Sequence, residues 1–199
     1  MEEKNRCAWC LINEPMTNYH DEEWGVPAHD DKRHFEYLLM EVMQCGLNWN
    51  MMVQKRSIFR ECFAEFDVRK VASFGEEEIE KILLVPGMIR SRRKIEAVIH
   101  NAGQFLKVAE EFGSFDAYIW GFTNGKTYVY KKHREGFMEV SNQLSDQVSK
   151  DMKKRGFKYA GSITIFSHLQ ACGIINDHAY DCWMYEKLVQ NENTVYIED

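Results

Sequence analysis

The chain has 199 residues, enough to bury a substantial hydrophobic core in one or two domains. Hydrophobic residues make up 45% and charged residues 28%, with 12 glycines and 3 prolines, which excludes a disordered, fibrous or small disulfide-stapled protein. The 25 basic and 31 acidic residues give a formal net charge of −6, so any contact with nucleic acid must come from local basic patches. No linker or repeat divides the sequence, and we predict one compact helical domain over residues 1–199, with one or two lobes.

Two regions of the sequence bear on targeting and membrane insertion. The first six residues are largely charged and no apolar segment follows them, so no signal or transit peptide is predicted. The longest uncharged stretch, residues 159–176, contains several Ser, Thr, His, Gln and Asn side chains, which favours a buried helix over a membrane span. We therefore expect a cytoplasmic protein with no membrane partner.

In the first half of the chain, apolar residues recur every three or four positions, as on the core-facing side of helices. One helix is predicted from Asp31 onward, with Glu41 on its flank, and the pattern repeats over residues 48–67. Residues 73–76 resemble a capping box that begins the next helix. The pattern stops at residues 85–90 and then resumes, which predicts two helices joined by a tight hairpin.

The second half contains one predicted strand. Asn124-Gly125 marks a turn, and residues 127–130 form the strand, followed by a loop over residues 131–145. Ser145 is predicted to begin a helix that ends near Gly156, and residues 162–173 are predicted to form the final, buried helix. The fold class predicted from these elements is all-α.

The cysteines and histidines contain a candidate metal site. The six cysteines are unevenly distributed, which argues against a disulfide framework. His178 and Cys182 are spaced as on one helical turn, and Cys7 with His20 supplies a second pair, a set of four ligands that suits a closed structural zinc site. Cys10 could replace Cys7, Cys7 and Cys10 could instead form a redox pair, or these thiols could be ordinary buried residues. The remaining histidines are interpreted as surface or satisfied core residues: His29, His34, His100, His133 and His168.

A candidate pocket lies near Glu41. This residue stands between apolar neighbours on its predicted helix, so its carboxylate could be partly buried and could stabilise a cation, although a solvated flank is the simpler interpretation. Four aromatic residues cluster in the sequence near this helix and the proposed ligands, and could stack a planar ring or simply pack the core: Trp9, Tyr19, Trp24 and Trp49.

The predicted hairpin at residues 85–90 is followed by Ser91-Arg-Arg-Lys94. Backbone N–H groups at the start of the second helix, together with clustered positive charge, can bind a phosphate. A solvated basic face is the alternative. Residues 131–134 and 150–158 add further local basic charge.

Six short motifs occur along the chain: Arg6-Cys-Ala-Trp9, Tyr19-His-Asp-Glu-Glu-Trp-Gly-Val-Pro27, Gly46-Leu-Asn-Trp49, Ile89-Arg90 with Arg93-Lys94, Lys154-Arg-Gly-Phe-Lys158, and Gln170-Ala-Cys-Gly173 with Asn176-Asp-His178. In order and wording they resemble the bacterial 3-methyladenine DNA glycosylase I (Tag) family of the helix–hairpin–helix superfamily. The resemblance extends from about residue 7 to residue 182 and implies a helix–hairpin–helix glycosylase fold.

The resemblance also implies roles for individual residues. One structural Zn²⁺ per chain is expected to join the N- and C-terminal segments through Cys7, His20, His178 and Cys182, which selects Cys7 over Cys10. Glu41 is the implied catalytic residue that contacts the damaged base, and the implied pocket walls are Trp9, Tyr19, Trp24 and Trp49. Leu47 resembles the wedge that enters the gap left by an extruded nucleotide, and the implied DNA-binding hairpin comprises Gly87, Met88, Ile89, Arg90, Arg93 and Lys94.

The implied reaction is hydrolysis of the N-glycosidic bond of 3-methyladenine in double-stranded alkylated DNA, which leaves an abasic site for base excision repair. No lysine nucleophile is indicated, so no lyase activity is expected. The family's usual Glu-Gly becomes Glu41-Val42, and its Ala-Gly-Leu-Ser-Trp becomes Cys45-Gly-Leu-Asn48-Trp49, followed by Asn50. We expect these changes to line the pocket, where they could alter the accepted base.

Two alternatives from other classes follow. One is a zinc-stabilised protein that binds damaged DNA without cleaving it, and the other is a thiol oxidoreductase that uses Cys7 and Cys10. A monomer is expected because the sequence contains no apolar heptad pattern.

Overall fold

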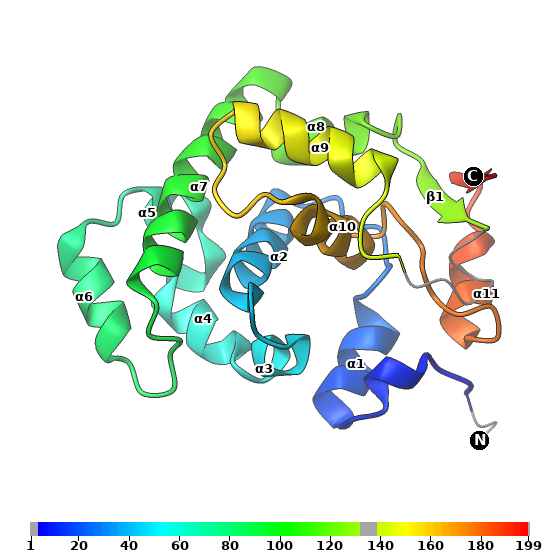
Figure 1. Cartoon of the computed structure of the whole chain (residues 1–199), viewed down its shortest axis with the longest axis horizontal. Helices are drawn as coiled ribbons and strands as arrows, with labels where there is room; N and C mark the ends of the chain where they lie inside the picture. The colour runs from blue at the N-terminus through cyan, green and yellow to red at the C-terminus, as the bar shows by residue number, and fades with distance from the viewer. Residues whose placement is uncertain (1–3, 132–138, 199) are drawn as a thin grey trace.

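A computed structural model describes residues 4–131 and 139–198 (Figure 1). The helices are α1 (Glu14–Glu22), α2 (Asp31–Gln44), α3 (Trp49–Gln54), α4 (Arg56–Cys62), α5 (Val68–Ala72), α6 (Glu76–Leu84), α7 (Arg92–Phe112), α8 (Phe115–Gly121), α9 (Gln143–Lys154), α10 (Ser162–Ala171) and α11 (Trp183–Val189). The remaining elements are two short 3-10 helices and two strands: η1 (Ala8–Cys10), η2 (Ala64–Phe66), β1 (Thr127–Tyr130) and β2 (Thr194–Ile197). The predicted mainly helical fold is confirmed.

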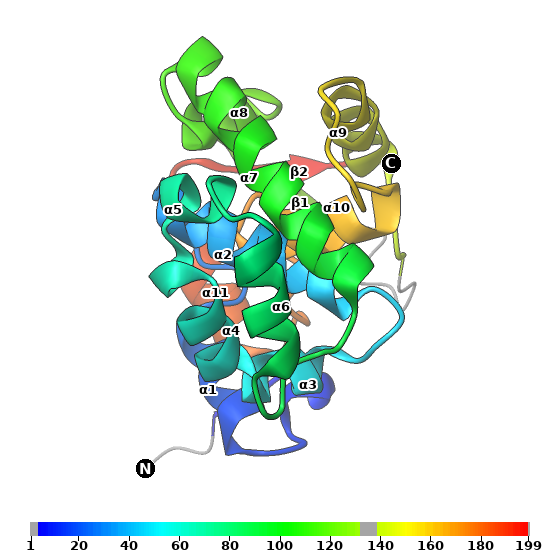
Figure 2. The same cartoon turned by 90° about the vertical axis from the view of Figure 1, so that its left-hand side faces the viewer.

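Helix α2 lies at the centre of the molecule, with α7, α8, α10 and α3 packed around it (Figures 1 and 2). It begins where the side chain of Asp30 accepts a hydrogen bond from the backbone N–H of Arg33, an N-cap of the usual type. Every residue from His34 to Met43 is buried, so both its apolar and its polar side chains face other helices. Because Glu41 belongs to this run, its carboxylate is held inside the protein.

Three predicted helix boundaries are wrong. Residues 48–67 do not form one helix, because the chain divides at Lys55 into α3 and α4 and takes a left-handed backbone at Ala64, Glu65 and Phe66 after α4 ends. Helix α6 is capped at Gly75, whose N–H donates to the Glu78 carboxylate, and not at residue 73. Asn142 rather than Ser145 caps α9, since its side chain accepts the backbone N–H of Ser145.

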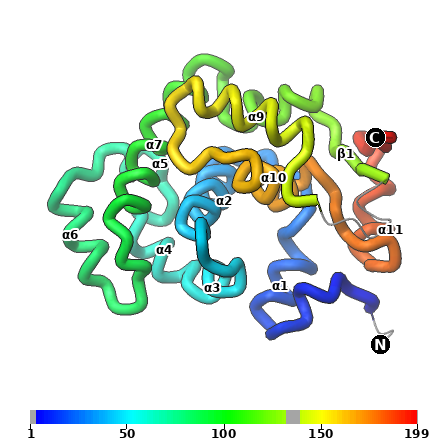
Figure 3. The backbone as a smooth tube through the Cα atoms, viewed as in Figure 1, coloured from blue at the N-terminus to red at the C-terminus, as the bar shows by residue number. Residues whose placement is uncertain are grey.

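The C-terminal segment differs more from the prediction. Helix α11 follows α10, so α10 is not the final helix. Strand β2 pairs in parallel with β1, with Thr127 opposite Thr194, so residues 127–130 are not the only strand. The chain thereby returns to the side of the molecule where the N-terminal segment lies, as the tube in Figure 3 shows. Part of the predicted loop at 131–145, including His133, lies outside the described residues.

Gly173 gives a test of the packing between α10 and the N-terminal segment. Its φ is +75°, and an added Cβ would lie 2.5 Å from the backbone nitrogen of Pro27 and 2.6 Å from the carbonyl carbon of Val26. Gly113 has a φ of +89° with nothing within 4 Å of such a Cβ, so it carries the same backbone restriction without the overlap.

We expect Gly113→Ala to cost about 1–2 kcal/mol from the left-handed backbone alone. Gly173→Ala should cost at least about 2 kcal/mol more, because backbone atoms cannot move aside as a side chain can. Each kcal/mol lowers Tm by about 2–4 °C in a chain of this size, so thermal unfolding of the two variants measures the difference. Equal Tm values for the two would show that the close approach at Gly173 is absent.

Of the helices in residues 4–131 and 139–198, none has the length and apolar character needed to cross a membrane.

Candidate active site

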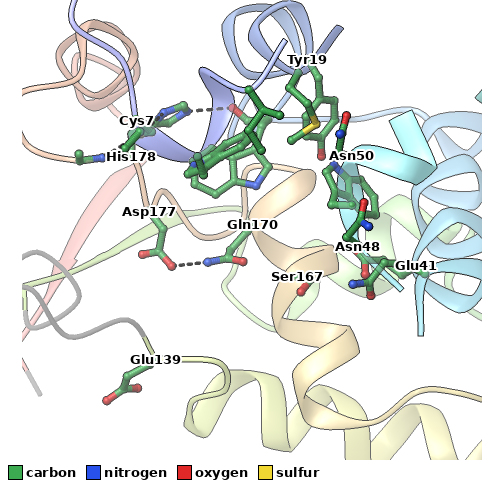
Figure 4. A pocket seen from close by; sticks show the side chains of 18 of the residues that line it. Cys7, Tyr19, Glu41, Asn48, Asn50, Glu139, Ser167, Gln170, Asp177 and His178 are labelled. Atoms are coloured by element: carbon green, nitrogen blue, oxygen red, sulfur yellow. Dashed lines mark hydrogen bonds between the residues drawn. The ribbon is translucent and has the colours of Figure 1, made fainter. Parts of the chain in front are cut away.

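A cavity of about 900 Å³ opens between α1, the end of α2, the start of α3, α10 and the segment before α11 (Figure 4). All five residues predicted for the base pocket line it: Trp9, Tyr19, Trp24, Glu41 and Trp49. They come from separate elements, which explains why only the folded chain brings them together. The five residues that the sequence analysis grouped therefore lie around one cavity.

Glu41 is a buried carboxyl group in the wall of this cavity. Its side chain is only 2% exposed, and none of the described residues donates a hydrogen bond to its carboxylate. Burial alone raises its pKa to about 8, since the ionised form loses solvation without gaining a partner. A buried carboxylate that lacks a protein partner is suited to receive a cationic or proton-donating ligand.

The aromatic residues form the walls of the cavity. The rings of Tyr19 and Trp49 lie 5.6 Å apart, and those of Trp9 and Trp24 meet edge to face at 4.9 Å. Within the described part of the chain, the Tyr19 hydroxyl and the Trp49 Nε1 are buried without a hydrogen-bond partner. A planar ligand with polar edges could therefore both stack on these rings and satisfy these two groups.

A cluster of four buried ligands lies beside this cavity, and Cys7 and His178 belong to both. The donor atoms of Cys7, His20, His178 and Cys182 all lie within 4.8 Å of one another. His178 Nδ1 is 3.2 Å from His20 Nε2, 3.6 Å from Cys182 Sγ and 3.7 Å from Cys7 Sγ, and Cys182 Sγ is 3.4 Å from His20 Nε2. A zinc tetrahedron with ordinary bond lengths requires about 3.3 Å between two nitrogens and about 3.6 Å between nitrogen and sulfur. The four residues fit a closed zinc site.

The groups that contact the two histidines of the cluster also fit a metal site. His20 Nδ1 lies 2.8 Å from the Asp21 carboxylate, which is held in turn by the guanidinium of Arg6, and His178 Nε2 lies 2.9 Å from the carbonyl oxygen of Trp24. Such contacts fix the orientation of ligating imidazoles. The thiol of Cys10 lies outside the cluster, donating to the carbonyl of Cys7 at 3.1 Å.

The helical spacing predicted for His178 and Cys182 is wrong, although the two side chains are brought together. His178 and Cys182 are not one turn apart on a helix: His178 lies outside any helix or strand, and Cys182 is the N-cap of α11. The loop between them brings the two donors to 3.6 Å.

The hairpin between α6 and α7 is the candidate DNA-contacting segment. Gly87 has a φ of +79°, and its carbonyl accepts a hydrogen bond from Lys55. Arg90 and Arg93 are exposed and Ile89 is half-buried, whereas Met88 is buried in the core. The two arginines can therefore reach a phosphate, and Met88 packs the turn against the core.

Lys94 departs from its predicted role. It is buried, and its ammonium group donates to the carbonyl oxygens of Met43 and Cys45 at 2.7 and 2.6 Å. Lys94 therefore caps the end of α2. The sequence had instead predicted that Lys94 contacts DNA. Leu47, the predicted wedge, follows this end of α2 and is 37% exposed. The hydrogen bonds of Lys94 therefore connect the hairpin segment to the loop that carries Leu47.

A model of the methyladenine glycosylase family matches residues 9–185. The chain belongs to this family. DNA-3-methyladenine glycosylase 1 of Escherichia coli (strain K12) is 39% identical over 180 residues, which cover 90% of this chain and 96% of that protein. The DNA-3-methyladenine glycosylase of Haemophilus influenzae is 34% identical over 177 residues, covering 89% of this chain and 96% of the relative.

Solved structures of the family agree with the fold. A crystal structure of 3-methyladenine DNA glycosylase I superposes with a TM-score of 0.85 at 37% identity and covers 90% of this chain and 98% of its own. A variant of 3-methyladenine DNA glycosylase I in complex with 3-methyladenine superposes with a TM-score of 0.84 at 33% identity and covers 90% of this chain and 96% of its own.

The departures from the methyladenine glycosylase pattern were expected to line the pocket, and the structure confirms this only in part. Asn48 and Asn50 line it, whereas Val42 is 1% exposed within the main core and does not reach the cavity, and Cys45 is not among the lining residues. Asn48 lies next to Glu41 in Figure 4, and its side-chain oxygen caps α3 by accepting the N–H of Met51. Because the Asn48 oxygen is occupied in this way, its amide nitrogen is the group that replacement of the family's usual serine makes available to a ligand.

Sequence reasoning missed the part of the pocket that comes from α10 and the segment after it. Ser167, Gln170 and Asp177 line the cavity, and Gln170 donates to Asp177 at 2.6 Å (Figure 4). The motif around Gln170 was the available signal, because it belongs to the stretch that resembles the methyladenine glycosylases.

Among the described residues, the interpretation of the remaining histidines as surface or satisfied core residues is wrong for His168 and holds only in part for His34, whose Nδ1 is buried without a partner. His100 and His29 have polar partners near the surface, and His34 Nε2 lies 3.0 Å from the Asp116 carboxylate. His168 is completely buried, and within residues 4–131 and 139–198 neither of its ring nitrogens has a hydrogen-bond partner. It is therefore not a satisfied core histidine.

Proposed function

We propose that this protein is a DNA-3-methyladenine glycosylase that hydrolyses the N-glycosidic bond of 3-methyladenine extruded from double-stranded alkylated DNA. The observation that carries the proposal is the unpartnered carboxylate of Glu41 in a cavity walled by aromatic rings. The names of the relatives and the complex of one of them with 3-methyladenine point to the same substrate.

The chemistry requires little acid catalysis, because an adenine methylated at N3 is cationic and leaves readily. Stacking on aromatic faces contributes about 1–3 kcal/mol per base, and the positive charge of the ring strengthens its attraction to their π systems. The ring's positive charge also favours ionisation of Glu41, whose carboxylate can then accept a hydrogen bond from the base. Undamaged adenine lacks this charge and is bound less tightly.

Hydrolysis without a covalent intermediate on the protein fits the groups present. The described residues that line the cavity include no lysine, and the buried Lys94 is held by two backbone carbonyls. The abasic site should therefore remain uncleaved. The DNA backbone would be bound by the hairpin of Gly87, Ile89, Arg90 and Arg93, and Leu47 would fill the gap in the duplex.

A structural zinc ion held by Cys7, His20, His178 and Cys182 is part of the proposal. When bound, it would act as a closed crosslink between the terminal segments and would leave no coordination position for substrate. Because Trp24 packs on His178 with ring centroids 4.6 Å apart, this crosslink also supports one wall of the base pocket.

We further propose that the chain is a single domain that acts as a monomer. One main core extends from Tyr19 to Ile175, and the terminal segments add a small cluster around Cys7 and Cys182. The base pocket lies where these two clusters meet, so both are needed to form it.

The exposed arginines of the hairpin give a testable consequence. Arg90→Ala and Arg93→Ala should each weaken binding to duplex DNA and reduce the slope of log K against log salt by about 1, because each removes one phosphate contact. Arg69→Ala, on the exposed face of α5, is the matched control. Fluorescence anisotropy with a labelled duplex at several salt concentrations measures the slopes. Identical slopes for all three variants and the unchanged protein would place the DNA elsewhere.

The proposed activity is tested by counting abasic sites in methylated duplex DNA after incubation with the zinc-loaded protein. We expect strand breaks that depend on the protein and appear only after alkali treatment. Breaks without alkali would contradict a monofunctional hydrolase. Tight binding to methylated DNA without abasic sites would support the damage-binding alternative instead.

A second candidate function is a glycosylase with an altered preference among alkylated bases. Asn48 and Asn50 favour it, because their amides line the cavity. The Asn50 oxygen accepts hydrogen bonds from Asn13 and Gln54, at 2.9 and 3.1 Å, and the Asn48 oxygen accepts one from the backbone of Met51, so each residue offers its amide nitrogen to a ligand. Asn48 is the one that lies beside Glu41, and it is therefore the residue to test. Asn48→Ser should then change the ratio of the bases released and leave binding to the DNA backbone unaltered.

A further inference from the structure

A second group of metal-binding side chains lies in the core, separate from the zinc cluster. His34 comes from the first turn of α2, His168 from α10, and Cys172 follows α10 directly. One donor atom from each lies within 4.8 Å of the other two, and all three side chains are completely buried. Neither the base pocket nor the proposed zinc site includes any of them.

The imidazoles of this group have nitrogens that nothing else uses. Within the described residues, His34 Nδ1 and both nitrogens of His168 are buried without a hydrogen-bond partner, which normally costs about 1–3 kcal/mol for each group. The other nitrogen of His34 lies 3.0 Å from the carboxylate of Asp116. A carboxylate behind an imidazole in this way is the usual support for a metal-ligating histidine.

The charge of the buried group favours a monovalent ion. All three side chains are completely buried, and an unbalanced charge is costly in such an interior. A monovalent ion that binds the thiolate displaces one proton, which leaves the charge of the site unchanged. A divalent ion would add a positive charge to a dry interior.

The number and type of donors narrow the choice further. Two nitrogens and one sulfur make a soft, three-ligand set, and thiolate ligands select Cu(I) among the available monovalent ions. Zinc in a closed protein site almost always takes four ligands, and this group offers three. We propose that His34, His168 and Cys172 form a buried three-coordinate site for Cu(I), with Asp116 orienting His34.

The test uses the zinc-loaded full chain, supplied with Cu(I) under oxygen-free, reducing conditions and then passed through gel filtration. We expect about one copper per chain to be retained without loss of zinc, and retention in His168→Phe to fall at least about tenfold. His100→Phe is the matched control, because His100 lies at the surface. His34→Leu removes a second ligand and serves if His168→Phe does not fold.

X-ray absorption at the copper edge gives a readout that needs no variant. One sulfur and two nitrogens per copper would support the site. Two sulfurs per copper would place the ion on Cys7 and Cys182 and would overturn the proposal, as would retention of no copper or equal retention by His168→Phe. Binding should also raise the Tm of the unchanged protein in the presence of Cu(I) but leave that of His168→Phe unaltered.

Discussion

Replacement of Glu41 by glutamine should slow single-turnover release of 3-methyladenine by about 10- to 150-fold, since a hydrogen bond to a charged group contributes about 1.5–3 kcal/mol. Glutamine keeps the size of the side chain and an acceptor oxygen but loses the charge. The cavity should therefore remain intact, and the loss should appear in the rate of release more than in binding to the DNA backbone.

The pH dependence of the same reaction identifies the carboxylate. Burial raises the pKa of Glu41 to about 8 in the free protein, so near pH 7 the group is mostly protonated there. Because the ionised form is the one that stabilises the cationic base, kcat/KM should rise with pH up to about 8 and then level off. Glu41→Gln should lose this rise.

The matched control is Glu61→Gln, on the exposed side of α4, which should keep both the rate and the pH profile of the unchanged protein. If Glu41→Gln released base at the unchanged rate with the same pH profile, Glu41 would have no part in the reaction.

Loss of the zinc crosslink is the second large effect that we expect. Cys182→Ala removes one of four ligands and leaves two imidazoles and a thiol buried around an incomplete site. Loss of a structural metal belongs to the class of changes that cost more than about 4 kcal/mol, which lowers Tm by more than about 8 °C in a chain of this length. Base release should fall with it, since Trp24 rests on His178.

Cys10→Ala is the matched control for the zinc site. Cys10 is also fully buried, and its thiol donates to the carbonyl of Cys7 without facing the cluster. We expect Cys10→Ala to retain one zinc ion per chain and Cys182→Ala to retain none. Zinc contents that are equal in the two variants, or a reversible disulfide between Cys7 and Cys10 in a zinc-free protein, would contradict the structural zinc site.

The residues predicted for the pocket line one cavity, and the four predicted ligands lie in one cluster, because both sets belong to motifs that resemble one family. The sequence predicted the central helix α2 for a different reason: ten consecutive buried residues still show the spacing of the apolar side chains on a helix. Local sequence patterns do not indicate how a polar side chain takes part in tertiary packing. Lys94 lies in one basic run with the exposed Arg90 and Arg93, yet the helix turns it inward, onto the carbonyls at the end of α2.

The C-terminal segment was missed for a related reason. Residues 194–197 have the β-branched and aromatic composition of a strand, but their partner, β1, lies more than sixty residues earlier in the chain. The buried pair of His34 and His168 was also missed, because no spacing in sequence links residues on α2 and α10. Contacts of this kind depend on how the helices pack and not on the period of any one helix.

The proposed role of the cavity is to recognise and excise 3-methyladenine. Chromatography of the bases released from DNA that carries both 3-methyladenine and 7-methylguanine decides whether it does so, with Trp49→Ala measured beside the unchanged protein. We predict that 3-methyladenine alone is released, and that Trp49→Ala slows its release by about 5- to 150-fold through the loss of one stacking surface. Release of 7-methylguanine, or of no base by a protein that still binds the methylated DNA, would contradict it.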